Sequence, residues 1–172
     1  MPKNIASLFS GCGGLDLGFS GGFVFRNTVC ERLDTNIVFA NDFDRDAWAC
    51  YNNNELLTND GVHSRLGDIR EIPTNEIPNF DILLAGFPCQ PFSNAGNRKG
   101  VHDDNGRGTL FEECERIIRE KIEVGHRPEA FLFENVRGIL SSKMQDGVTT
   151  VPDEIHKRME NLGYQVSMKL VC

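Results

Sequence analysis

Short runs of apolar residues alternate along the chain with longer segments in which apolar residues recur at helical spacing. The clearest apolar run is residues 81–85, and similar runs occupy 5–9, 37–40 and 130–133. Unbroken apolar character is typical of strands that are buried on both faces. A weaker strand region closes at residues 67–69. The pattern therefore predicts five strands in a buried sheet.

Helices are predicted between these strands, where apolar residues return every third or fourth position. The segments with this spacing are 15–19, 44–51, 111–122 and 153–162. Residues 164–171 alternate between polar and apolar positions, which predicts a last strand. The alternation of strands and helices predicts a doubly wound α/β sheet in a single domain over residues 1–172.

Polar residues, glycines and one cysteine stand where the predicted strands end. These ends are Ser10-Gly11, Asn41-Asp42, Phe87-Pro88-Cys89 and Glu134-Asn135. In doubly wound sheets the functional groups gather at the carboxyl ends of the strands. We therefore expect all of these residues to lie along one edge of the sheet.

A glycine turn follows the first strand. Gly11, Gly13 and Gly14 allow the backbone to approach a ligand closely and to direct amides at it. The spacing is not Gly-x-Gly-x-x-Gly, since Asp16 stands in place of the third glycine. The alternative is a turn that only links a strand to a helix.

Acidic residues end the second and third strand regions. Asp42 is placed to accept hydrogen bonds from ribose hydroxyls, and Phe43 beside it can stack on an adenine ring. Asp68 can accept a hydrogen bond from an adenine amino group. Alternatively, both aspartates cap the segments that follow and Phe43 belongs to the core. Because they follow successive strands, together with the glycine turn, an adenosine-type cofactor is the better account.

Cys89 is the candidate nucleophile. Pro88 and Pro91 fix the backbone around it, and a polar stretch over residues 93–108 follows. Thiolates are strong nucleophiles, and amides at the start of a following helix would lower the pKa of the thiol. The alternative is a buried, inert cysteine, the commoner fate of this residue type.

Glu134 is the candidate proton donor. It follows four apolar residues directly, so we expect it to be buried, with a raised pKa and a proton available for donation. Alternatively, it caps the next segment or pairs with Arg137. A thiolate and a protonated carboxyl group on neighbouring strands suit attack on an electron-poor ring.

Composition sets further limits. The formal net charge of -7 is unlike that of a protein that grips DNA alone, which needs a basic surface. The six cysteines include no Cys-x-x-Cys pair and the four histidines are scattered, so we expect no metal site, and five of the cysteines are expected in the core. No apolar run reaches the ~18 residues of a membrane span, and the N-terminus does not resemble a signal peptide, so we expect a cytoplasmic protein.

Three segments resemble DNA cytosine-5 methyltransferases, in that family's order and approximate spacing. They are Phe9-Ser-Gly-Cys-Gly-Gly-Leu-Asp-Leu-Gly-Phe19, Gly86-Phe-Pro-Cys-Gln-Pro-Phe-Ser-Asn-Ala-Gly96 and Phe133-Glu-Asn-Val136. The resemblance runs through nearly the whole chain. It implies a Rossmann-like, S-adenosylmethionine-dependent methyltransferase sheet, with double-stranded DNA as the partner.

The resemblance also implies roles for individual residues. Cys89 would attack C6 of a flipped-out cytosine, so that C5 accepts the methyl group, while Glu134 would hold N3 and the amino group. The residues implied at the cofactor are Phe9, Gly11, Gly13, Gly14, Asp42, Phe43, Asp68, Ile69, Pro88 and Leu110. The implied DNA-closing loop offers the candidate contacts Ser93, Arg98, Lys99 and Arg107.

The family continues past the end of this chain at residue 172. The family continues with a Gln-x-Arg-x-Arg segment, a target-recognition region and a final helix, none of which is in this sequence. We therefore expect a sheet that is incomplete at its C-terminal edge and a segment that is inactive alone. The missing C-terminal portion is then its partner. Two alternatives stay open, an RNA (tRNA) cytosine-5 methyltransferase and a non-catalytic cofactor- or DNA-binding relic.

Overall fold

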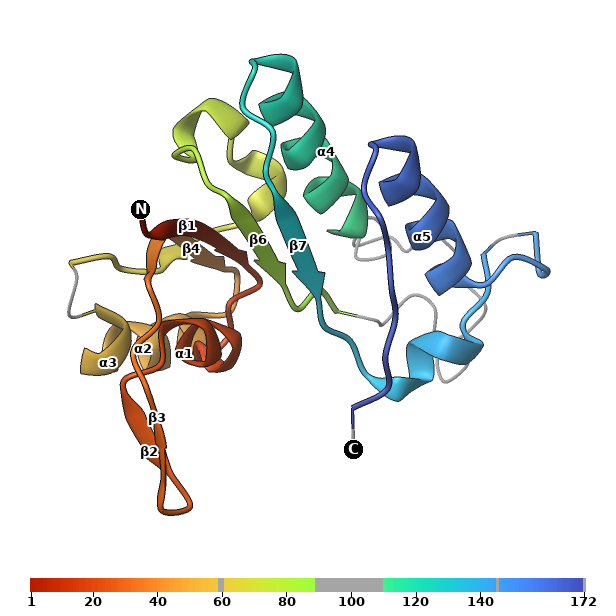
Figure 1. Cartoon of the computed structure of the whole chain (residues 1–172). Helices are drawn as coiled ribbons and strands as arrows, with labels where there is room; N and C mark the ends of the chain where they lie inside the picture. The colour runs from red at the N-terminus through yellow and green to blue at the C-terminus, as the bar shows by residue number, and fades with distance from the viewer. Residues whose placement is uncertain (59–60, 89–109, 145, 172) are drawn as a thin grey trace. The chain divides into compact units, whose positions relative to one another are not determined.

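The computed structural model describes residues 1–58, 61–88, 110–144 and 146–171, and it contains a five-stranded sheet (Figure 1). The strand order is β5-β4-β1-β6-β7, and every pairing between these strands is parallel. The strands are β1 (Lys3–Leu8), β4 (Thr35–Asp42), β5 (Arg65–Leu66), β6 (Ile82–Ala85) and β7 (Ala130–Phe133). The predicted parallel α/β sheet is confirmed.

Four α-helices lie in the segments where helical spacing predicted them, and the short helix α3 was not predicted. The α-helices are α1 (Gly14–Ser20), α2 (Arg45–Asn52), α3 (Glu55–Thr58), α4 (Leu110–Glu123) and α5 (Val151–Asn161). Short 3₁₀ turns are η1 (Ile69–Glu71), η2 (Thr74–Glu76) and η5 (Arg137–Ser141). Among the described helices, none is both long and apolar enough to cross a bilayer.

The chain divides into two compact units. One contains Met1–Gly86 and Glu120–Phe133, and therefore the whole sheet; the other contains Phe87–Arg119 and Glu134–Cys172.

The core of the first unit lies on the central strands. Ile5 of β1 and Leu84 of β6 are fully buried and pack with Tyr51 of α2 and Leu57 of α3. Burial of such side chains is the main stabilising contribution, about 1.5–3 kcal/mol for each large aliphatic residue. This core fixes the carboxyl ends of β1 and β4, where the candidate site lies.

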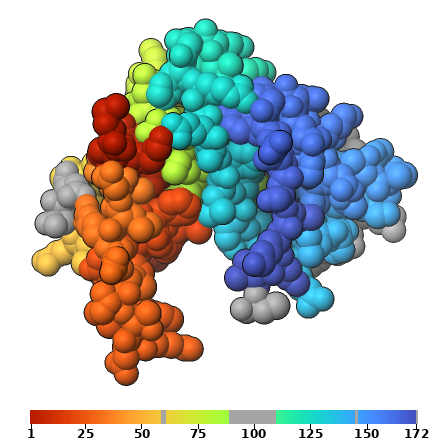
Figure 2. All heavy atoms as spheres, in the orientation of Figure 1, coloured from red at the N-terminus to blue at the C-terminus, as the bar shows by residue number. Residues whose placement is uncertain are grey.

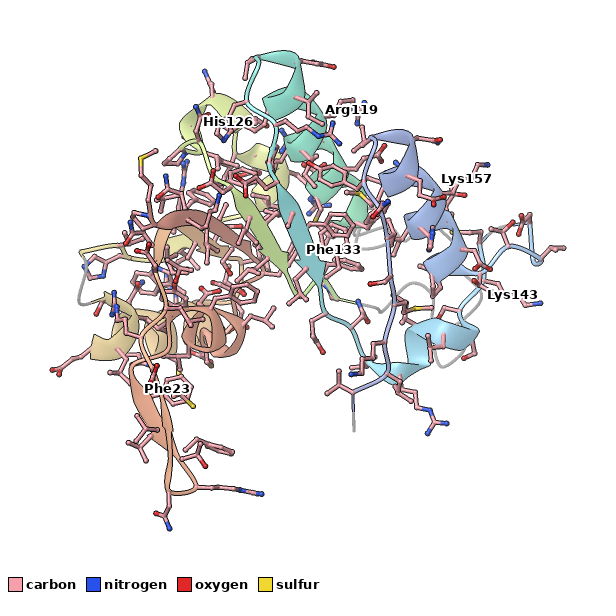
Figure 3. The ribbon with its side chains drawn as sticks, viewed as in Figure 1. Phe23, Arg119, His126, Phe133, Lys143 and Lys157 are labelled. Atoms are coloured by element: carbon pink, nitrogen blue, oxygen red, sulfur yellow. The ribbon has the colours of Figure 1, made fainter. Side chains whose placement is uncertain are left out.

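The side chains of Lys121, near the end of α4, and His126, in the loop after it, contact the segment before β6. The buried Lys121 donates hydrogen bonds from Nζ to the Ile77 carbonyl (2.6 Å) and to Asn79 Oδ1 (3.2 Å), and burial lowers its pKa. His126 Nε2 lies 2.8 Å from the Phe80 carbonyl oxygen (Figure 3). These contacts satisfy carbonyl groups that precede β6.

A β-hairpin that the sequence pattern did not predict extends from the first unit. It pairs β2 (Phe23–Phe25) with antiparallel β3 (Thr28–Cys30), and Figure 2 shows it as an orange projection. Its turn residues Arg26 and Asn27 both have positive φ (48° and 63°). The hairpin leaves Val24, Phe25 and Val29 exposed.

The predicted last strand is wrong. Residues 164–171 belong to no strand of the described structure, and most of their side chains are exposed. Alternation predicts which face of a strand would be buried, but a strand forms only where a neighbouring backbone supplies hydrogen bonds. In the described part of the chain this segment pairs with no strand.

The second unit is held together by α5 and the first part of α4. Met159 of α5 and Cys114 of α4 are fully buried. Arg158 forms ion pairs with Glu112 (3.2 Å) and Glu115, and its guanidinium carbon lies 5.2 Å from the centre of the Phe111 ring. These contacts join the two helices within this unit.

Candidate cofactor-binding site and candidate catalytic segments

The glycine turn begins directly after β1. Gly13 N donates a hydrogen bond to the Ser10 carbonyl (2.8 Å), and Phe9, Gly11 and Gly13 all have positive φ (54°, 55° and 85°). A left-handed conformation costs a residue with a side chain about 1–2 kcal/mol. Phe9 therefore carries backbone strain of about this size. Residues with strained backbones are concentrated at ligand-binding segments.

Only glycine fits at position 13. A Cβ atom there would lie 2.2 Å from Leu57 Cδ1 and 3.1 Å from the Tyr51 ring. Gly14 differs, since an added Cβ would meet no atom within 4 Å. The turn therefore packs on the side chains of α2 and α3 through Gly13.

Asp42 at the end of β4 contacts this turn directly. Its Oδ2 accepts a hydrogen bond from Gly11 N (2.7 Å), and its Oδ1 accepts one from Asp44 N (2.8 Å). A carboxylate offers about four acceptor positions, so two remain for a ligand. Asp44, not Asp42, caps α2, by accepting from the amides of Asp46 and Ala47. The alternative in which Asp42 is the helix cap is wrong.

Asn41 connects three strand ends, a function that the sequence analysis missed. This buried side chain donates from Nδ2 to the carbonyls of Arg65 and Gly67 (both 2.9 Å). The main-chain carbonyl of Asn41 accepts a hydrogen bond from Ser10 N (3.0 Å). The available signal was its place beside Asp42 at a strand end. Asn41 thus holds the glycine turn and the Gly67-Asp68 segment at the end of β4.

Phe43 lies outside the core. Its side chain is 75% exposed directly after Asp42, so the alternative of a core phenylalanine is wrong. A large apolar ring that is exposed beside free carboxylate positions can cover a planar ligand.

Asp68 follows β5 and caps η1 by accepting from Arg70 N (2.9 Å). The Arg70 guanidinium also binds its carboxylate, and these hydrogen bonds hold the pKa of Asp68 below its ordinary value. Ile69 is buried. Asp68 thus caps η1, as the alternative interpretation predicted. This capping leaves part of the carboxylate for a ligand.

A buried polar cluster lies behind the glycine turn. Asp16 of α1 and Tyr51 of α2 are fully inaccessible, and their carboxylate and hydroxyl oxygens form no direct hydrogen bond within 3.5 Å in the described structure. Burial raises the pKa of Asp16 and that of Tyr51. In the sequence Asp16 stands where a third glycine would be expected, and nothing in the pattern predicted its burial.

The remaining candidate residues belong to the second unit. Asn135 Nδ2 donates to the Phe87 carbonyl (2.8 Å), which joins the segment before Pro88 to the segment after β7. Pro88 is exposed and Leu110, the first residue of α4, is half-buried. The predicted nucleophile and loop residues lie outside the described residues; they are Cys89, Ser93, Arg98, Lys99 and Arg107.

The expected burial of Glu134 is wrong, because this residue is exposed. The four consecutive apolar residues Ala130–Phe133 predicted a strand that is covered on both faces. However, β7 is the edge strand of the described sheet, with Ala130 and Leu132 exposed and Phe131 and Phe133 half-buried.

The expectation for the other cysteines is only partly met. Cys114 is buried and Cys30 is half-buried, whereas Cys12 and Cys50 are exposed. Cys12 belongs to the glycine turn, where the chain leaves the core.

The parallel sheet, with a glycine turn and carboxylates at successive strand ends, has the Rossmann-like fold of methyltransferases. Solved structures with this fold include a Dnmt2 methyltransferase of S. pombe (TM-score 0.62, 24% identity, 92% of this chain and 42% of that chain). Another is the Entamoeba histolytica methyltransferase EhMeth (TM-score 0.62, 18% identity, 94% of this chain and 44% of that chain).

The sequence gives the more specific classification. The model of the C-5 cytosine-specific DNA methylase family matches residues 3–172, and the chain belongs to this family. Curated relatives include the Type II methyltransferase M.BanI of Aneurinibacillus aneurinilyticus, which is 39% identical over 99% of this chain and 34% of its own length. M.FnuDI of Fusobacterium nucleatum is 38% identical over 97% of this chain and 41% of its own length. The chain thus spans less than half the length of these relatives.

Proposed function

We propose that this chain binds S-adenosylmethionine and carries the nucleophile of an enzyme that methylates C5 of cytosine in DNA. The observation that carries the proposal is the hydrogen bond from Gly11 N to the Asp42 carboxylate (2.7 Å). It brings together the glycine turn and the acidic strand end, which the family pattern assigns to one cofactor.

The donor set fits an adenosine-type cofactor. Asp42 keeps two acceptor positions for ribose hydroxyls, and the exposed ring of Phe43 stands beside it for the adenine. Asp68 and the Ile69 backbone are proposed to contact the adenine as well. Phe9, Gly11, Gly13 and Gly14 are proposed around the methionine portion, with Pro88 and Leu110 as further lining residues.

The bound cofactor supplies an electrophilic methyl group on a sulfonium. The Cys89 thiolate is proposed to add to C6 of the cytosine, which makes C5 nucleophilic toward that methyl group. Glu134 is proposed to hydrogen-bond N3 and the exocyclic amino group. Loss of the C5 proton then expels the thiolate and restores the ring. Neither C5 nor C6 can be attacked within a stacked duplex, so the base must leave the helix.

Double-stranded DNA is the proposed substrate, and Ser93, Arg98, Lys99 and Arg107 are proposed contacts of a loop that closes on it. With a formal net charge of -7, the chain has no general excess of basic residues for binding DNA phosphates. We propose that much of the DNA contact comes from a C-terminal portion like that of the longer relatives. Their Type II names support a place in a restriction-modification system.

Calorimetry with S-adenosylhomocysteine and the chain as it stands tests the cofactor half of the proposal, with measurable binding expected. A second experiment uses the full-length polypeptide that the gene encodes, incubated with duplex DNA containing 5-fluorocytosine and with S-adenosylmethionine. We expect a covalent complex that Cys89→Ser abolishes. Methylation of tRNA without methylation of duplex DNA would contradict the proposed substrate.

A further inference from the structure

Arg70 holds the Asp68 carboxylate from one side. Its Nε lies 2.9 Å from Oδ1 and 3.0 Å from Oδ2, and its Nη2 lies 2.5 Å from Oδ2. Paired contacts of this kind fix the plane of a carboxylate as well as its position. The backbone amide of Arg70 adds a further hydrogen bond to Oδ1 (2.9 Å).

These contacts occupy most of the acceptor positions of Asp68. A carboxylate has about four, two on each oxygen. Oδ1 accepts from Arg70 N and Nε, while Oδ2 accepts from Nη2 and shares Nε. By this count the position that remains belongs to Oδ2. Asp68 can therefore offer one directed lone pair to a ligand.

Stability of the fold does not account for this arrangement. In this ion pair the Arg70 side chain is 42% exposed, and Asp68 is two residues away in the chain. Partly solvated pairs of this kind typically contribute less than about 1 kcal/mol. Loss of this ion pair should therefore cost the first unit little stability.

We propose that Arg70 is a positioning residue for cofactor recognition, which aims one Asp68 lone pair at the 6-amino group of the purine. This inference rests on the proposed function, since it assumes that an adenosine cofactor binds here. An ionised carboxylate only accepts hydrogen bonds, so it favours the amino group of adenine over the 6-oxo group of hypoxanthine. Arg70 thereby sets purine selectivity without being required to touch the purine.

The charge state of Asp68 supports the proposal. Hydrogen bonds from Arg70 hold its pKa below the ordinary value, so it stays ionised in mildly acidic solution. In Arg70→Ala this pKa rises. Preference for the amino group should then disappear at a higher pH in the variant than in the unchanged protein.

Calorimetry with two ligands tests the inference. S-adenosylhomocysteine carries the 6-amino group and S-inosylhomocysteine carries a 6-oxo group. We expect the unchanged chain to prefer the adenosyl compound by on the order of 10- to 100-fold, the effect of one hydrogen bond to a charged group. In Arg70→Ala the preference should fall to about threefold or less, with weaker binding of the adenosyl compound alone. Arg70→Lys should restore it only in part, because an ammonium lacks the paired geometry.

Arg65→Ala is the matched control. Arg65 is an exposed arginine of the same segment, but it pairs with Glu76 (2.7 Å). It should leave the preference unchanged. Equal loss of both ligands in Arg70→Ala would mean a general structural role and would overturn the inference. If the unchanged chain binds neither ligand, the proposed function fails first, so the two failures are distinguishable.

Discussion

The side-chain amide of Asn135 donates a hydrogen bond to the main-chain carbonyl of Phe87 (2.8 Å), across 48 positions of sequence. Phe87 leads into Pro88-Cys89, and Asn135 follows Glu134 directly. One hydrogen bond therefore fixes the segment before the proposed nucleophile relative to the segment that carries the proposed acid. The same Asn135 accepts from Val136 N through Oδ1 (3.0 Å), which sets the orientation of its amide.

Asn135→Asp should slow methyl transfer by the full-length enzyme, because a carboxylate cannot donate to the Phe87 carbonyl. A misplacement worth about 1.4 kcal/mol in the transition state lowers kcat about tenfold. Cofactor affinity, measured by calorimetry, should change by less than about twofold. Asn161→Asp, at an exposed asparagine that ends α5, should leave kcat unchanged. Normal kcat in Asn135→Asp would contradict the positioning role.

Gly13→Ala and Gly14→Ala should have different effects on stability. A Cβ at position 13 would clash with Leu57 and would occupy a left-handed backbone (φ 85°). We expect a loss of about 2–4 kcal/mol in the free energy of unfolding, from overpacking and strain together. Gly14→Ala has room and should be neutral or stabilising in urea titrations. Equal stability of the two variants would argue against the packing described for the turn.

Asp16→Asn should stabilise the fold at neutral pH by about 1–3 kcal/mol, because it removes a buried ionisable group. Burial raises the pKa of Asp16 above its ordinary 3.8 in the folded state. Its contribution to stability is therefore greatest below that ordinary value and is lost as pH rises through the folded-state pKa. The advantage of Asp16→Asn should accordingly grow between pH 4 and pH 7 in urea titrations. Asp46→Asn, at an exposed residue of α2, should show no such trend.

Asp42→Asn and Asp44→Asn should separate cofactor binding from helix capping. An amide has one acceptor oxygen, so Asp42→Asn loses a hydrogen bond to Gly11 N or to Asp44 N. We expect its Kd for S-adenosylhomocysteine to rise tenfold or more. Asparagine is a good helix cap, so Asp44→Asn should preserve both stability and affinity. Equal affinities of the two variants would count against Asp42 as a cofactor contact.

Much of the fold was predictable, because periodicity reports local structure and burial. The apolar runs correctly predicted β6 and β7. However, four apolar residues cannot distinguish a central strand from an edge strand. That distinction depends on strand order, and it explains why Glu134 is exposed after β7. The missed hairpin has a different cause. Its turn is Arg26-Asn27 without the glycine that usually marks such turns.

The site was predictable at the level of strand ends, but its hydrogen bonds were not. Gly11 and Asp42 were expected on one edge, and the structure brings them into contact. Asn41 was missed because its hydrogen-bond partners lie 24 and 26 positions away in the sequence. Arg70 was missed because its importance lies in the contact between its guanidinium and the Asp68 carboxylate. A sequence pattern identifies which residue types are unusual at a position. It does not identify the donor that each acceptor will meet.

The β2–β3 hairpin has a consequence for how the protein opens. Among the described residues its strands pair with each other and with no other strand, and Val24, Phe25 and Val29 bury little surface. A two-stranded hairpin of this kind is marginally stable, so it opens and closes many times while the parallel sheet stays intact. In hydrogen–deuterium exchange its amides should lose protection well before those of β1 and β6, whose exchange reports global unfolding. The hairpin is therefore the natural site for a spectroscopic probe or an inserted tag that must leave the sheet undisturbed.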